Sequence, residues 1–152
     1  MYLVLKLVLL LQVFQLVQLD IVLVWYILEQ LHLFVEINPE GISYGFFFYK
    51  PRPLVMEAIR RDIQRDPKAF LEMIRKAEQA TGVPITAKHY RYPKPTEDKE
   101  LERFFYWKEQ IGCVVDEPFS EATFGPELAK RVADFLEPLI PVYEYFCKFR
   151  TE

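Results

Sequence analysis

Residues 32–50 read HLFVEINPEGISYGFFFYK, and this stretch decides the fold. Apolar and polar residues alternate over residues 31–37, NPEG supplies turn residues, and ISYGFFFYK is rich in aromatic residues. Alternation places every second side chain on one face of a strand, while Asn, Pro and Gly favour a reversal of the chain. We therefore expect an antiparallel hairpin over residues 31–49. Its internal glycine, Gly45, is interpreted as a strand bulge rather than part of a phosphate loop.

A first helix is expected to begin at Pro53, because proline suits the first helical position. Apolar residues at helical spacing predict its buried stripe: Leu54, Ala58, Ile59 and Ile63. This stripe leaves three arginines facing solvent or a groove: Arg60, Arg61 and Arg65.

A second helix is expected immediately afterwards. Asp66 is its predicted N-cap, Pro67 its first residue and Gly82 its terminator. The inward-facing residues are predicted from their spacing: Phe70, Ile74 and Ala77.

The remaining sequence completes a sheet covered by helices. TEDKELERFFYWKEQ predicts a helix capped by Thr96, and IGCVVDE predicts a short strand. A closing helix is expected to begin at Pro126, with a break or kink near Pro138 and Pro141. The order of elements predicts a single α+β domain, with an antiparallel sheet packed by helices.

The composition sets limits on the function. The chain has 152 residues, enough for one domain with a core. Its formal net charge of −3 gives no overall attraction to nucleic acid or anionic lipid, so an anion site requires a local cluster of Lys and Arg. Cys113 and Cys147 lie far apart and outside any CxxC motif. This usage indicates reduced thiols and a cytoplasmic protein.

Residues 1–31 form an atypical segment rich in Leu, Val and Gln. Lys6 and Asp20 interrupt it, and its charge-free runs fall short of the ~20 residues that a membrane-spanning helix needs. It also lacks the basic start and small cleavage-site residues of a signal peptide. We therefore expect neither a membrane span nor secretion.

The same segment is unusual in its amino-acid types. From Met1 to Glu36 the sequence contains no Ala, Ser, Thr, Pro, Gly, Arg or Cys. Two explanations stand open: a reading-frame error, or an authentic but truncated or divergent N-terminus. We divide the chain into this segment, residues 1–31, and an α+β domain, residues 32–152. The apolar segment also predicts self-association of the full chain.

Residues 83–100, VPITAKHYRYPKPTEDKE, are the most informative polar stretch. Cationic and aromatic side chains gather there between prolines: Lys88, His89, Tyr90, Arg91, Tyr92 and Lys94. In an extended chain, Lys88, Tyr90 and Tyr92 would share one face, and His89 and Arg91 the other. Arginine offers a fork of donors to phosphate or carboxylate. The alternative is an edge strand protected by charge and proline.

Two hypotheses of function follow. The first is a noncatalytic binding or interaction domain, whose basic-aromatic segment contacts a small anionic ligand or a protein partner, helped by Arg60 and Arg61. The second is an enzyme acting on a small phosphorylated or carboxylated substrate, with His89 or Tyr90 as acid or base, which requires a concave pocket where His89 meets a carboxylate. Neither His32 nor His89 has partners at metal-ligand spacing, and no nucleophile or cofactor motif is present, so no metal, cofactor or catalytic residue is assigned.

Five blocks in order carry a family resemblance: FVEINPEGISYGFFFYKP, MEAIRRDIQRDPKAF, HYRYPKP, FYWKEQIGCVVDEPFSEATFGPELAKRV and LEPLIPVYEYF. Over residues 33–149 the chain resembles the C-terminal part of the bacterial family catalogued as domain of unknown function 2461. The resemblance implies a single α+β domain and carries no activity, cofactor or partner with it.

The chain also departs from that family's pattern. Relatives carry a basic region before the hairpin, approximately R-x-x-R-F-S-K-D-K, and nothing in residues 1–31 matches it. Tyr92 stands where the family implies Arg, and Glu109 where it implies Lys. The resemblance therefore implies a weaker positive potential here than in relatives.

Overall fold

The computed structural model describes residues 31–120 and 125–149. The atypical segment 1–31, and the self-association predicted from it, falls outside these residues except for Leu31. Along the described chain the elements are β1 (Leu31–Asn38), β2 (Gly41–Phe48), α2 (Pro53–Arg65), α3 (Pro67–Thr81), β3 (Thr86–His89), the 3-10 helix η1 (Lys99–Leu101), α4 (Glu102–Phe105), β4 (Trp107–Pro118), α5 (Glu127–Leu136), the 3-10 helix η2 (Glu137–Leu139) and α6 (Ile140–Cys147).

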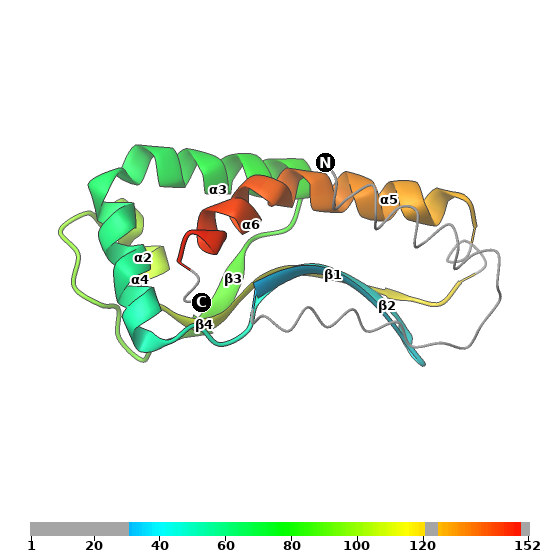
Figure 1. The fold of residues 1–152 in the computed structure, drawn as a ribbon, viewed down its shortest axis with the longest axis horizontal. Helices are drawn as coiled ribbons and strands as arrows, with labels where there is room; N and C mark the ends of the chain where they lie inside the picture. Colours follow the sequence, from blue (N-terminus) through cyan, green and yellow to red (C-terminus); the bar gives the residue numbers. More distant parts are fainter. Residues whose placement is uncertain (1–30, 121–124, 150–152) are drawn as a thin grey trace.

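The described strands form a four-stranded antiparallel sheet in the order β1-β2-β4-β3. The predicted hairpin is confirmed, since β1 pairs with β2 from Leu31 opposite Phe48 to Asn38 opposite Gly41. In Figure 1, α3, α5 and α6 run over one face of this sheet. The chain is therefore a single α+β domain whose antiparallel sheet is packed by helices, as predicted.

The core lies between that face of the sheet and the helices. Alternate residues of β1 are buried, and β2 contributes Phe46, whose ring stacks on Phe146 of α6 at a centroid distance of 5.8 Å. Burying large apolar and aromatic side chains contributes about 25 cal/mol per Å² of apolar surface, the main favourable term in folding. The sheet and helices are thus held together by their shared apolar interface.

Gly45 is not a bulge, contrary to the sequence interpretation. The β2 register runs without a shift on both sides, against β1 and against β4. Gly45 has φ of +154°, and a Cβ at this position would lie 2.0 Å from the carbonyl oxygen of Cys113 on β4. The glycine therefore permits close approach of the two backbones.

Local signals predicted the limits of α3 well. Asp66 accepts a hydrogen bond from the Ala69 N–H at 3.2 Å, Pro67 begins the helix, and Gly82 ends it in the left-handed conformation. The inward residues Phe70, Ile74 and Ala77 are all buried, as predicted. The break near the two C-terminal prolines is also confirmed, by η2 between α5 and α6.

One prediction about α2 was wrong. Leu54 was placed in the buried stripe, but it is 76% exposed; Val55 and Met56 are buried instead. Arg60 was predicted to face solvent or a groove; it is only 8% exposed, so it does not face open solvent, and it lines a cavity. The apolar stripe is rotated from the predicted one, and this rotation brings Arg60 inward.

The helix predicted from Thr96 is much shorter than expected. Asp98 caps η1 by accepting a hydrogen bond from the Glu100 N–H at 2.9 Å, and α4 ends at Phe105. Trp107 to Gln110 belong to β4, where Trp107 pairs with His89 of β3. Pairing with a distant strand outweighs the local helical pattern there.

Candidate anion-binding site

The basic-aromatic segment lies at one edge of the sheet. Within the described residues β3 pairs only with β4, so it is an edge strand. Two register shifts interrupt its pairing, between Thr86 and Lys88 and between Lys88 and His89. The simple alternation of faces predicted for residues 88–92 does not hold, because the strand ends at His89 and is irregular before it.

Three of the predicted site residues make contacts of their own along this edge. Lys88 Nζ lies 3.2 Å from Glu109 Oε1, an ion pair that compensates its charge. The His89 ring packs on Tyr106 at a centroid distance of 5.6 Å. The Arg91 guanidinium lies 5.3 Å from the centre of the Tyr92 ring. His89 is exposed and forms no hydrogen bond or ion pair with a carboxylate of the described residues.

The chain then turns from the sheet edge toward α2. The Tyr90 N–H donates to the Tyr106 carbonyl oxygen at 2.8 Å, and the Lys94 N–H donates to the Phe105 carbonyl oxygen at 2.9 Å. The Lys94 ammonium lies over the Tyr90 ring, 4.5 Å from its centre. These contacts hold Lys94 beside α4 and α2.

A cavity of about 270 Å³ lies where this segment meets α2. Its lining brings together three of the seven predicted site residues, Arg60, Arg61 and Lys94. The other lining residues are Glu57, Gln64, Pro95 and Phe105. We call this cavity the α2 pocket. Lys88, His89, Tyr90 and Arg91 do not line it.

Arg60 is the unusual residue of the α2 pocket. Its side chain is more than nine-tenths buried, and its Nη1 atom has no hydrogen-bond partner among the described residues. A buried charge without a compensating partner costs several kcal/mol, even after relaxation of its surroundings. Arg60 therefore lines the pocket with a guanidinium that has one N–H donor group without a partner in the described chain and that forms no ion pair there.

The electrostatic surroundings of Arg60 are positive on balance. Arg61 and Lys94 form no ion pair with any residue of the described ranges. Glu57 contributes a carboxylate to the lining, but it too makes no ion pair within the described chain, although it stands four residues before Arg61 on α2. Three cations and one carboxylate favour occupancy by an anion.

Sequence reasoning missed Glu57, Gln64, Pro95 and Phe105 as pocket residues. A signal was available for the first two, because residues 57, 60, 61 and 64 have the i, i+3, i+4, i+7 spacing of one helix face. No local signal places Phe105 there, since α4 reaches the pocket only through tertiary packing.

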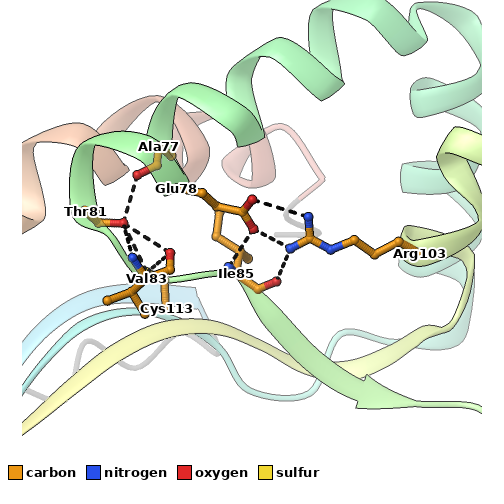
Figure 2. A network of polar contacts seen from close by, with 7 residues as sticks. All are labelled: Ala77, Glu78, Thr81, Val83, Ile85, Arg103 and Cys113. Atoms are coloured by element: carbon orange, nitrogen blue, oxygen red, sulfur yellow. Dashed lines mark hydrogen bonds and ion pairs between the residues drawn. The ribbon is translucent and has the colours of Figure 1, made fainter.

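A second polar cluster lies between α3, α4 and β4, and Figure 2 shows its contacts. Arg103 donates to both carboxylate oxygens of Glu78 and, at 2.8 Å, to the carbonyl oxygen of Ile85. The Ile85 N–H donates back to Glu78 at 2.9 Å. Burial alone would raise the pKa of Glu78, but the bonds from Arg103 and Ile85 outweigh it and lower the pKa below its usual range. Arg103, Glu78 and the Ile85 backbone thus satisfy one another's hydrogen bonds within the protein, and we call these three residues the clamp.

The thiol of Cys113 completes the same cluster. It lies 3.6 Å from the carbonyl oxygen of Val83 and 4.0 Å from the hydroxyl of Thr81. Burial raises the pKa of Cys113 to about 11, so the thiol is neutral at physiological pH. Because the thiolate is the nucleophilic form, this buried cysteine is chemically inert.

A third cluster joins the sheet to α5. The Tyr44 hydroxyl donates to Glu117 at 2.6 Å, and Arg131 binds both oxygens of the same carboxylate at 3.1 and 3.2 Å. Burial and the neighbouring carboxylate raise the pKa of Tyr44 to about 12. Here again the cation is paired within the protein, which distinguishes this cluster from the α2 pocket.

The fold and the pocket define an α+β domain with an uncompensated basic cavity at one end of its sheet. Comparison with protein families gives a match over residues 27–145 to a family described as "Conserved hypothetical protein (DUF2461)". The chain belongs to this family, as its sequence blocks predicted. A search of the curated proteins and a search of the solved structures each found no match.

The family match begins inside the atypical segment 1–31, so the boundary at residue 31 stays a prediction. No helix in the described ranges has the length and apolar content to cross a membrane. The described residues also contain no group of three or more His, Cys, Asp or Glu side chains arranged to hold a metal ion.

Proposed function

We propose that the chain is a noncatalytic binding domain that holds the anionic group of a small ligand in the α2 pocket. The observation that carries this proposal is the buried guanidinium of Arg60, whose Nη1 has no partner in the described chain. An anion in the pocket would compensate this charge and those of Arg61 and Lys94. The proposal narrows the site predicted from sequence to the three cations that meet in one cavity.

Size and chemistry together favour phosphate or carboxylate as the bound group. A cavity of about 270 Å³ is smaller than the ≈ 300–1,000 Å³ pockets that hold drug-sized molecules, so it suits a head group rather than a large cofactor. The planar guanidinium presents donors in a fork that matches phosphate and carboxylate oxygens. Gln64 adds a side-chain amide, which could form a hydrogen bond with a hydroxyl group of the ligand next to its anionic group.

Binding through this pocket is expected to be weak and sensitive to salt. Arg61 and Lys94 are exposed, and interactions between exposed charges are screened over about 10 Å at 0.1 M ionic strength. The proposal includes a cytoplasmic location, which the two free cysteines, Cys113 and Cys147, support. A protein that carries the anionic group on its surface is the alternative partner.

The test is a titration of the full-length chain with inorganic phosphate. Binding is measured by calorimetry and by changes in amide chemical shifts. Arg60→Met is expected to weaken binding at least about tenfold, because a hydrogen bond to a charged group contributes about 1.5–3 kcal/mol. Arg75→Met removes the same charge from the exposed surface of α3 and serves as the matched control. It should change the affinity less than about twofold.

Glu57→Gln sharpens the same titration. The substitution removes a negative charge from the lining without changing the size of the side chain, so phosphate should bind about two- to threefold more tightly. Equal phosphate affinity in the parent, Arg60→Met and Glu57→Gln proteins would show that the α2 pocket is not the anion site. Near-ultraviolet circular dichroism of each variant checks that the fold is retained.

A further inference from the structure

A second cavity is lined by Tyr90, whose ring contacts Lys94 of the α2 pocket. It measures about 500 Å³ and is lined by Lys50, Pro51, Arg52, Pro53, Tyr90, Lys108 and Glu109. Its residues come from the connection between β2 and α2, from the first residue of α2, from the segment that follows β3, and from β4. We call it the edge pocket.

The edge pocket is also basic. Lys50, Arg52 and Lys108 form no ion pair with any described residue. Its one carboxylate, Glu109, is already compensated by Lys88 at 3.2 Å. The chain as a whole has a net charge of −3. Three cations without ion pairs in the described chain around one cavity are therefore a local excess of positive charge on a protein that is negative overall.

Tyr90 and Lys94 join the two cavities. Tyr90 lines the edge pocket, and Lys94, whose ammonium lies 4.5 Å from the centre of the Tyr90 ring, lines the α2 pocket. Lys108 approaches the same ring at 5.9 Å. The two pockets are therefore neighbours that share one aromatic-cation contact.

Helix α2 gives the approximate spacing between them. Its N-cap, Arg52, lines the edge pocket, and Arg60, eight residues further on, lines the α2 pocket. At 1.5 Å of rise per residue, these two backbone positions are about 12 Å apart along the helix. Pro51, Pro53 and Tyr90 offer an apolar wall beside the first of these positions.

From this arrangement we propose that the two pockets act together and bind an elongated small molecule with a phosphate or similar anionic group at each end. This inference rests on the proposed function, because the α2 pocket must bind one end. The two groups should be about 10 Å apart, close to the spacing along α2. The part of the ligand between its two end groups would pass Tyr90, which lines the edge pocket and contacts Lys94 of the α2 pocket.

Binding through two linked groups predicts a dependence on linker length. Once one end is bound, the other faces its pocket at an effective concentration in the millimolar range, which is greatest when the linker matches the span. A linker that is too short cannot reach the second pocket, and one that is too long loses the advantage. An optimum length is the signature of two pockets acting together.

The experiment titrates the full-length chain with methylphosphonate and with bisphosphonates whose phosphonate groups are joined by methylene, butane, octane and dodecane linkers. The octane compound is expected to bind most tightly, at least about tenfold more tightly than methylphosphonate. Lys108→Met should reduce this ratio of affinities to about twofold or less, and Lys108→Arg should restore it. Arg75→Met, on the exposed surface of α3, is the control for a general loss of positive charge.

The outcomes separate this inference from the proposed function. Methylphosphonate binding that Arg60→Met weakens, with no optimum linker length, would overturn the two-pocket inference and leave the α2 pocket as an anion site. A steady rise in affinity with linker length would indicate burial of the linker alone and would also overturn it. Failure of every compound to bind would overturn both proposals. Tighter binding of a short single-stranded oligonucleotide than of the octane compound would overturn the assignment to a small ligand.

Discussion

Arg103 on α4 and Arg60 on α2 differ in how the protein compensates their charges. Arg103 is 43% exposed at its side chain, yet it donates to Glu78 twice and to the Ile85 carbonyl oxygen (Figure 2). Arg60 is far more buried, and its Nη1 has no partner in the described chain. A cation that holds the fold together is expected to be paired within it. A buried cation left unpaired is better explained by a ligand than by stability.

The largest expected effect is the loss of stability when Arg103 of the clamp is replaced. Arg103→Met removes three hydrogen bonds and leaves the half-buried Glu78 carboxylate without its cation. We expect a loss of about 2 kcal/mol in the free energy of unfolding, measured by urea denaturation. Arg75→Met, at an exposed position that forms no ion pair within the described ranges, should change it by less than about 0.5 kcal/mol. Similar losses in the two variants would mean that the clamp is not stabilising.

The opposite result is expected at Arg60. In phosphate-free buffer, Arg60→Met should leave the free energy of unfolding unchanged or raise it by up to about 1 kcal/mol, because methionine fills a similar volume without a buried charge. Saturating phosphate should then stabilise the parent chain and not the variant, since a ligand stabilises only the folded state that binds it. A loss of more than 1 kcal/mol without phosphate would assign Arg60 a structural role.

The smallest expected effect is the acid dependence of the clamp. The pKa of Glu78 is lower in the folded chain than its ordinary value. The Glu78 carboxylate therefore stabilises the folded state fully at pH values above the unfolded-state pKa of about 4.3. This stabilisation is lost as the pH falls through the folded-state pKa. The difference in urea midpoint between the parent chain and Glu78→Gln should therefore be constant near pH 7 and shrink as the pH falls below about 4. A difference that stayed constant down to pH 3 would contradict an ionic contribution.

The parts of the fold that depend on local chemistry could be predicted from the sequence. Asp66, Pro67 and Gly82 act within one or two turns of α3, so their signals needed no knowledge of distant residues. The hairpin of β1 and β2 is similarly local, with its turn residues between two alternating strands. The helix prediction failed for Trp107 to Gln110 because the pairing of this strand with β3 is a tertiary contact.

The candidate site was predictable only in part, for the same reason. Arg60, Arg61 and Lys94 were proposed from residue type alone, whereas the cavity that they line forms where α2 packs against the segment after β3. The burial of Arg60 depends on the rotation of α2, and a stripe that began at Leu54 gave the wrong rotation. Lys88 was predicted as a ligand contact, whereas its pairing with Glu109 depends on the register of β3 against β4.

The position of Lys94 between Pro93 and Pro95 has a consequence for the thermodynamics of binding. Proline fixes its own φ near −65° and restricts the residue before it, so the backbone of this segment has few alternative conformations. The hydrogen bond from the Lys94 N–H to the Phe105 carbonyl oxygen restricts it further. If the proposed anion binds, little backbone conformational entropy would remain to be lost in this segment, which would favour the affinity of the pocket to that extent.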